Sequence, residues 1–331
     1  MSPDAEVEAV RSGVGLFTLG DRMLVELRGG DRVRWLQGQV SNDVASLAPG
    51  QGCYATVLTV KGGIVADLHV LAWDGCFWLE TGASAREALW QRLDRTIVAD
   101  DVTLLDASAR FARLALEGAR VNELLSEVSG LPGRPASAGT WPLAPECAER
   151  VEIAGRSVVA WAFGFTNGPA VQLLTAPEDA AAVRAGLVEV GARHGLVSAG
   201  RETLDTLRVE AGVPGLGSEL DEDVFPAEAR LEHALSTNKG CYTGQEIVER
   251  IRSRGAVNYR LVGLRFAGPV PAPGAELRSP EGKRVGEVTS VARSPRAGAI
   301  GLGFLRRELE TPGTEVQTPD ATARVAELPF V

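Results

Sequence analysis

The last quarter of this 331-residue chain has a different residue pattern from the rest, and this difference constrains the fold more than any other feature of the sequence. After Gly255 the sequence consists of short stretches rich in β-branched residues, such as VGLRF, RVGEVTSVA and AIGLGFL, separated by glycine and proline. No convincing helical periodicity interrupts them before the end of the chain. This pattern is typical of a small all-β domain, and we expect it to close into a barrel. The sequence therefore predicts two parts, residues 1–255 and a C-terminal β-barrel domain at residues 256–331.

The first part predicts an α+β fold with antiparallel sheets. Apolar and aromatic stretches predict strands at residues 23–27, 54–60, 63–73, 76–82, 102–105, 111–116 and 151–161. The turns Lys61-Gly62-Gly63 and Asp74-Gly75 join three of these strands into hairpins. Periodicity and capping residues predict helices at residues 31–40, 84–93, 120–128, 178–194 and 199–209. Residues 131–145, rich in proline, glycine, serine and alanine, predict a loop.

Composition limits the classes of function. The net charge of −9 disfavours direct nucleic-acid binding, because phosphate binding relies on lysine and arginine. No apolar run approaches the roughly 18 residues needed to span a bilayer, so we expect no membrane association. Four cysteines without CxxC spacing indicate a reducing compartment, and we expect a cytoplasmic protein. The cysteines and the three histidines show no metal-ligand spacing, so no metal site is predicted.

The most unusual segment is NKGCYTGQE at residues 238–246. Thr243 and Glu246 form a T-x-x-E capping box, which predicts that a helix begins here. Cys241 would then lie just before a helix N-terminus and beside the Lys239 ammonium, and both features lower the pKa of a thiol. The alternative is a glycine-rich turn in which the cysteine is only a small buried residue.

Two further segments carry acidic residues in unusual places. Glu210 ends the predicted helix LDTLRVEAG, where a carboxylate opposes the helix dipole, so it is either held for a ligand or simply solvated. Asp67 lies within the apolar stretch GIVADLHV, and His69 shares its face of the strand by the period of two. An exposed Asp67 on the polar face is the alternative to a buried functional carboxylate.

These segments, in this order, resemble the folate-binding superfamily of the glycine-cleavage T-protein. LQGQVSNDVASLAPGQ, KGGIVADL, DTLRVEAGVP and VGEVTSVARSPRAGAIGLGFL each match a part of it, so the resemblance covers nearly the whole chain. KGCYTGQE, at residues 239–246, is similar to the short signature of the YgfZ branch of this superfamily. The resemblance implies a three-lobed fold, with two interleaved α+β lobes in residues 1–255 and a C-terminal barrel.

The resemblance also implies a ligand and its site. The expected cofactor is tetrahydrofolate or a one-carbon derivative, with the Glu210 carboxylate accepting two parallel hydrogen bonds from the pterin. Cys241 is the expected functional centre, with Lys239 beside it and Asp67 as a weaker catalytic candidate. The family's aminomethyltransferases carry a pair of acids where this chain has Ala66-Asp67. The other expected cofactor-binding residues belong to the signature and are Gly240, Tyr242, Gly244, Gln245 and Glu246.

YgfZ-like proteins act in the assembly, maintenance or repair of iron–sulfur enzymes, and through them in tRNA modification. The resemblance therefore implies that role, with a reduced folate and iron–sulfur client or assembly proteins as partners. One alternative is a folate-dependent aminomethyl- or methyltransferase, which the loss of an acid at Ala66 disfavours. Another is a non-catalytic, folate-responsive scaffold, for which Cys241 would be dispensable.

Overall fold

Two tight hairpins build the first sheet. In this computed structural model, which describes all residues except 130–142, 167 and 256, the turns at Gly62 and at Asp74-Gly75 have the positive φ angles that such turns require. The sheet has the order β3-β4-β5-β2-β6 with all neighbours antiparallel. Its strands are β2 (Arg22–Arg28), β3 (Gly52–Leu58), β4 (Ile64–Trp73), β5 (Cys76–Gly82) and β6 (Thr103–Asp106).

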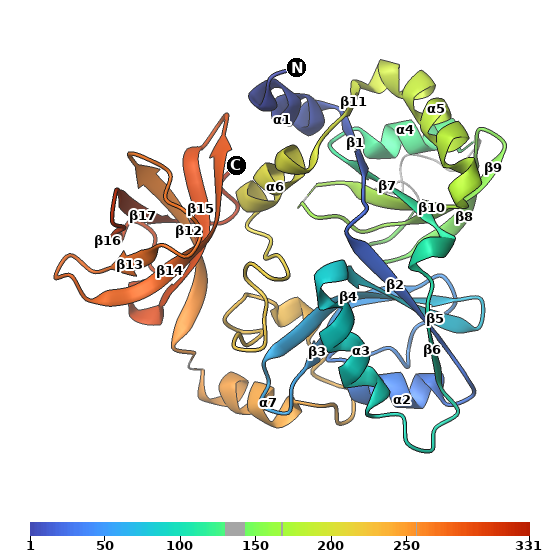
Figure 1. The fold of residues 1–331 in the computed structure, drawn as a ribbon, viewed down its shortest axis with the longest axis horizontal. Coiled ribbons are helices and arrows are strands. Elements are labelled where there is room, and N and C mark those ends of the chain that lie inside the picture. The colour runs from blue at the N-terminus through green and yellow to red at the C-terminus, as the bar shows by residue number, and fades with distance from the viewer. Residues whose placement is uncertain (130–142, 167, 256) are drawn as a thin grey trace.

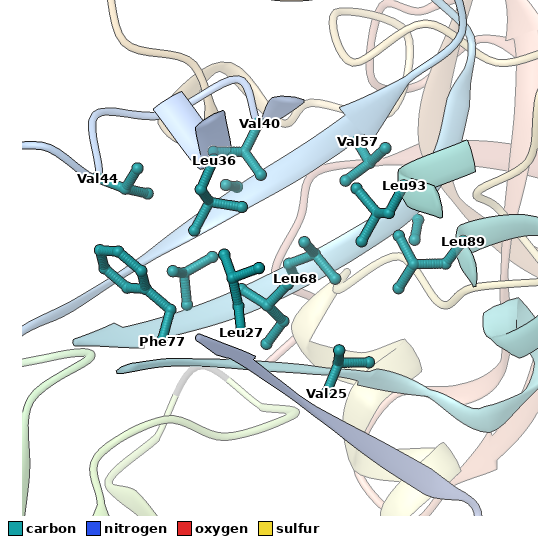
Figure 2. Close-up of a cluster of buried hydrophobic side chains, with 14 of the residues drawn as sticks. Val25, Leu27, Leu36, Val40, Val44, Val57, Leu68, Phe77, Leu89 and Leu93 are labelled. Atoms are coloured by element: carbon teal, nitrogen blue, oxygen red, sulfur yellow. The ribbon is translucent and has the colours of Figure 1, made fainter. Parts of the chain in front are cut away.

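Helices α2 (Arg32–Gln39) and α3 (Arg86–Asp94) cover one face of this sheet. Figure 2 shows the resulting core, in which Leu36 and Leu93 from the two helices lie against Leu68 of β4. All three side chains are at most 1% exposed. Burial of such side chains stabilises the fold by roughly 1.5–3 kcal/mol each. This core fixes one face of β4, and the residues that alternate with it face the other way.

The second sheet is six-stranded, with the order β11-β1-β7-β10-β9-β8. Trp73 of β4 and Trp161 of the second sheet belong to one apolar cluster, so the two sheets pack face to face. Helices α4 (Val121–Val128) and α5 (Ala180–Gly191) cover its outer face (Figure 1). The strands are β1 (Val14–Thr18), β7 (Ala112–Glu117), β8 (Ala148–Ile153), β9 (Arg156–Trp161), β10 (Ala170–Thr175) and β11 (Leu196–Ser198).

The C-terminal strands close into a barrel of order β12-β15-β14-β13-β16-β17, as expected from the sequence. They are β12 (Tyr259–Ala267), β13 (Glu276–Arg278), β14 (Arg284–Ser294), β15 (Gly298–Arg306), β16 (Glu315–Gln317) and β17 (Thr322–Ala326). Leu264, Val288 and Leu305 fill its interior and are fully buried. The predicted α+β class with antiparallel sheets and a barrel is confirmed, although β1 and β11 pair in parallel.

Helix α6 (Arg201–Ala211) lies between the barrel and the rest of the molecule (Figure 1). It contacts β14 and β15 on one side and α1 (Pro3–Ser12) on the other. Helix α7 (Gln245–Arg254) lies beside the turn between β3 and β4, where Ile247 packs close to Gly62. The sequence did not predict helix α1 or strands β1, β10 and β11, and the one strand predicted at residues 151–161 is instead the two strands β8 and β9.

The loop predicted at residues 131–145 lies mostly outside the described residues, and 143–145 contain no helix or strand. Within the part of the chain that the structure describes, no helix has both the length and the apolar character needed to cross a bilayer.

Candidate functional site

A cavity of about 1000 Å³ lies where the two sheets, α6 and the barrel meet. Its walls come from β3 and β4, the loop after β9, the segment that follows α6, and β14 of the barrel. This volume is at the upper end of the range for pockets that hold a drug-sized ligand. The polar and charged residues that line it include Arg22, Tyr54, Asp67, His69, Glu146, Arg201, Asp205, Arg208, Arg230, His233, Glu287 and Thr289.

Tyr54 and Asp67 form a hydrogen-bonded pair on this wall. The Tyr54 hydroxyl donates to Oδ2 of Asp67 at 3.0 Å. Burial, reinforced by the Asp67 charge, raises the pKa of Tyr54 well above its usual range, so the phenol stays a donor. Oδ1 of Asp67 is buried and has no hydrogen-bond partner among the described residues, and the same holds for Oγ1 of Thr289. Two cavity-lining residues therefore each carry a buried oxygen whose hydrogen bond is unmade, which costs free energy that a bound ligand can recover.

His69 and Glu146 form a second pair beside the first. Nδ1 of His69 lies 3.0 Å from both carboxylate oxygens of Glu146. Its ring stacks on Phe163 with 3.8 Å between the centroids and lies 5.0 Å from the Tyr54 ring, which in turn stacks on His233. Burial lowers the pKa of His69, but the Glu146 charge and hydrogen bond outweigh it and raise the pKa above the usual value.

A half-buried cation is fixed at the same wall. Arg22 donates Nε and Nη2 to the two oxygens of Glu80, each at 2.6 Å, and Arg113 donates to Glu80 at 2.8 Å. Burial would raise the pKa of Glu80, but the two arginines lower it to about 2. The Arg22 guanidinium lies 4.8 Å from the centroid of the Phe165 ring, also a cavity residue. The network holds a charged wall and an aromatic surface in one arrangement.

Glu117 holds the loop that carries this aromatic surface. It is fully buried and accepts hydrogen bonds from the Phe165 amide at 2.8 Å and the Thr166 hydroxyl at 2.7 Å. Burial raises the pKa of its carboxyl to about 7. A Cβ atom on Gly164 would lie 2.7 Å from this carboxylate, so the loop approaches Glu117 as closely as glycine permits.

Sequence comparison places the chain among known proteins. Residues 2–239 match the family described as GCVT N-terminal domain, and residues 260–331 match the glycine cleavage T-protein C-terminal barrel domain. The chain belongs to the glycine-cleavage T-protein family. Two relatives named aminomethyltransferase, from Rubrobacter xylanophilus and Halalkalibacterium halodurans, are 33% and 30% identical to it. Both matches cover 98% of this chain, and they cover 85% and 88% of those proteins.

A crystal structure of the glycine cleavage system aminomethyltransferase T from Bartonella henselae has the same fold. The TM-score is 0.87 at 24% identity, and the match covers 100% of this chain and 90% of that one. The name shared by the sequence relatives supports the aminomethyltransferase alternative better than the iron–sulfur interpretation. The T-protein family is thus established for this chain, whereas its YgfZ branch is not addressed by these relatives.

Glu210, the expected pterin ligand, does not line the cavity. Its side chain is 2% exposed and forms an ion pair with Arg11 of α1. Asp205 and Arg208, from the same helix, line the cavity instead. The reason is the helical period, because residues two or five positions apart do not share a face of an α-helix. Arg11 pairs with Oε2 of Glu210, while Oε1 is buried without a hydrogen-bond partner among the described residues.

The structure places the Lys239 side chain against the C-terminus of α2. Its ammonium donates to the carbonyl oxygens of Gln37, Val40 and Asn42 at 2.7, 2.6 and 2.8 Å. These carbonyls lie at and just beyond the C-terminus of α2, where a helix leaves carbonyl groups unpaired and favours a cation. Burial lowers the pKa of Lys239 to about 8. The Lys239 ammonium is thus engaged by three backbone carbonyls at the end of α2.

Cys241 is exposed, and neither it nor any other residue of the signature loop, defined as residues 239–246, lines the cavity. The expected folate-binding residues of this loop therefore lie together but do not form part of the cavity wall; they are Gly240, Tyr242, Gly244, Gln245 and Glu246. The expected capping box is wrong. Gly244, with φ of +83°, precedes α7, and no side chain caps the helix.

The structure adds residues that the sequence did not single out, above all Tyr54, Arg22 and Glu146. Tyr54 and His69 are partners in the β3–β4 register, but a register shift between Val57 and Leu58 separates this pair from the predicted turn. Glu146 lies 77 positions from His69 in the sequence, and no sequence pattern predicts that the two side chains meet. Of the sequence candidates, only Asp67, together with its neighbour His69, lies in the cavity.

Proposed function

We propose that this chain binds tetrahydrofolate, or a one-carbon derivative of it, in the cavity beside Asp67. The observation that carries this proposal is the unpartnered Oδ1 of Asp67 in a wall of a cavity of about 1000 Å³. A carboxylate oxygen in this position accepts an N–H from the pterin, the role that the sequence assigned to Glu210. Phe163 and Phe165 supply apolar surface nearby, and the guanidinium groups of Arg22 and Arg208, paired with Glu80 and Glu219, lie at the same cavity. When bound, the folate supplies a carrier for one-carbon units.

Calorimetric titration with tetrahydrofolate under anaerobic conditions tests this proposal. Asp67→Asn keeps the shape of the side chain and removes its charge, and it should weaken binding about 10- to 100-fold, as expected for a hydrogen bond to a charged group. Glu210→Gln should leave the affinity unchanged, because Glu210 faces Arg11 rather than the cavity. The reverse result would place the pterin at Glu210 and overturn the site proposed here. A lack of binding by the unmodified protein would overturn folate binding itself.

For the use made of the folate, we propose the YgfZ-type role in maintaining iron–sulfur enzymes. Two sequence features support it, namely the KGCYTGQE signature loop and Ala66 in place of one acid of the aminomethyltransferase pair. The exposure of Cys241 leaves its thiol accessible to a partner protein. A single cysteine cannot hold a cluster, so the iron–sulfur group belongs to the client.

The aminomethyltransferase activity is the second candidate, and the names of the sequence relatives favour it. Two measurements separate the candidates. In cells that lack the protein, the content of tRNA nucleosides made by iron–sulfur enzymes should fall, and it should be restored by the unmodified chain but not by Cys241→Ser. Tetrahydrofolate-dependent release of ammonia from an aminomethylated donor by the purified protein, unaffected by Cys241→Ser, would instead establish the transferase.

A further inference from the structure

His69 has one ring nitrogen committed and one available. Nδ1 contacts both oxygens of Glu146, while Nε2 makes no hydrogen bond to any residue that the structure describes. The ring is held on both sides, by stacking on Phe163 and by the tilted contact with Tyr54. His69 lines the cavity, so the available nitrogen is the polar atom that it can offer to a ligand.

Glu146 is itself held in an uncommon conformation. Its φ is +64°, in the left-handed region that non-glycine residues seldom adopt. Two backbone contacts hold it there: its amide donates to the Ala162 carbonyl at 2.8 Å, and its carbonyl accepts the Trp161 indole N–H at 3.2 Å. Such a conformation costs about 1–3 kcal/mol and persists only where the surroundings fix it. The carboxylate is therefore positioned on His69 before any ligand arrives.

The charges around His69 favour its protonated form. The titratable and charged groups that face it are Glu146 from the loop before β8, Glu80 from β5, Asp67 from β4, Tyr54 from β3, Arg22 from β2 and His233 from the segment after α6. Arg22 is balanced by Glu80, so Glu146 decides the local field. An imidazolium held by Glu146 through Nδ1 keeps an N–H at Nε2 that it can donate.

We propose that the His69–Glu146 pair makes ligand binding in this cavity proton-linked, with the His69 imidazolium donating from Nε2 to a carbonyl oxygen of the bound molecule. Asp67, two residues earlier on the same face of β4, offers the acceptor Oδ1 beside it. A donor next to an acceptor matches a cyclic amide edge, in which an N–H adjoins a C=O, as in a pterin. The inference rests on the proposed folate binding and adds the protonation state that binding requires.

The sign of the effect follows from linkage. Below the pKa of His69 the imidazolium is already present, and binding exchanges no proton. Above that pKa, binding must draw a proton from solution, so the dissociation constant rises by up to tenfold per pH unit. A neutral His69 would instead offer a lone pair at Nε2, which repels a carbonyl oxygen.

Calorimetry of tetrahydrofolate binding in two buffers of different ionisation enthalpy, repeated from pH 6 to pH 9.5, measures the proton uptake. In the unmodified protein the uptake should rise toward one proton as the pH increases, and His69→Asn should show no such rise while still binding. His194→Asn is the matched control, because His194 pairs with Glu127 at 2.7 Å but does not line the cavity. The His194→Asn variant should take up as many protons on binding as the unmodified protein. Binding without proton uptake, or uptake that survives in His69→Asn, would overturn the inference and leave folate binding intact.

Nuclear magnetic resonance supplies a readout that needs no ligand. The chain has three histidines, so His69→Asn assigns the His69 signals directly. Glu146→Gln should lower the pKa of His69, because burial then acts without the opposing carboxylate. An unchanged His69 pKa in this variant would overturn the role of Glu146. If tetrahydrofolate does not bind at all, the proposed function and this inference both fail, whereas binding without uptake removes the inference alone.

Discussion

A Cβ atom on Gly244 would lie 2.8 Å from the carbonyl oxygen of Thr59, so the backbone before α7 is pressed against the β3–β4 turn. Gly62 of that turn would meet Ile247 of α7 in the same way, at 3.0 Å. The two glycine-rich motifs of the sequence, KGGIVADL and the signature loop, therefore meet in space (Figure 1). Each motif supplies glycines because the contact leaves no room for a side chain.

Gly244→Ala should destabilise the protein by about 2–4 kcal/mol. Its φ of +83° strains any other residue, and the new Cβ would strike backbone rather than a flexible side chain. Gly240→Ala is the matched control in the same loop, because nothing lies within 4 Å of its added Cβ. Guanidinium unfolding of the two variants measures the difference. Equal stabilities would show that the loop does not pack against Thr59 in solution.

Lys239→Met should cost about 2–4 kcal/mol of stability, because it leaves the carbonyls of Gln37, Val40 and Asn42 without their shared donor. Lys61→Met, at an exposed position of the β3–β4 turn, should change stability by less than about 0.5 kcal/mol. Thermal unfolding of both variants provides the comparison. If Lys239 acted only on the Cys241 thiol, the two substitutions would have equally small effects on the stability of the fold.

Local patterns explain what the sequence could predict. The hairpin glycines predicted β3 and β4, and the apolar periodicity predicted α6, because turn geometry and one buried face act within a few residues. The capping box failed because Thr243 donates its amide to the Gly38 carbonyl, and a left-handed Gly244 then forms the entry to α7. This helix start depends on packing against a turn that is distant in the sequence, and local helix propensity carries no information about that contact.

The candidate site was less predictable for the same reason. The partners of Lys239 lie about 200 positions earlier in the chain, as does Arg11, the partner of Glu210. A β-bulge between Val57 and Leu58 shifts the register of the β3–β4 hairpin. One residue of slip exchanges the two faces of a strand, so the position of Tyr54 beside Asp67 does not follow from the turn alone.

Arg11→Met should destabilise the protein by about 3–5 kcal/mol, because it leaves the buried Glu210 carboxylate without its ion-pair partner. Adding Glu210→Gln to that variant should recover part of the loss by removing the unpaired charge. Urea unfolding of the two single variants and the double variant measures the coupling. Additive effects would show that the two side chains do not interact.

Glu117→Gln should change how stability depends on pH. The pKa of Glu117 is raised to about 7 in the folded protein, from an ordinary value near 4.5 in the unfolded chain. The contribution of Glu117 to the free energy of unfolding is therefore fully present below about pH 4.5. It is lost as pH rises through 7, a loss on the order of 3 kcal/mol. The variant should lack this decline. Unfolding free energies of both proteins between pH 5 and pH 8.5 test this prediction. Parallel curves would show that burial does not raise the pKa of Glu117.

The four cysteines should react with iodoacetamide at very different rates. Cys241 is exposed, whereas burial raises the pKa of Cys53 to about 12 and that of Cys76 to about 11. At pH 8 only about one Cys53 thiol in ten thousand is a thiolate, the form that attacks the reagent. Burial also raises the pKa of Cys147. Mass spectrometry of the labelled protein should show Cys241 modified first, and Cys241→Ser should lose the fast phase. A fast phase that persists in this variant would mean that one of the other thiols is accessible in solution, and Cys241 would no longer be the thiol best placed to meet a partner.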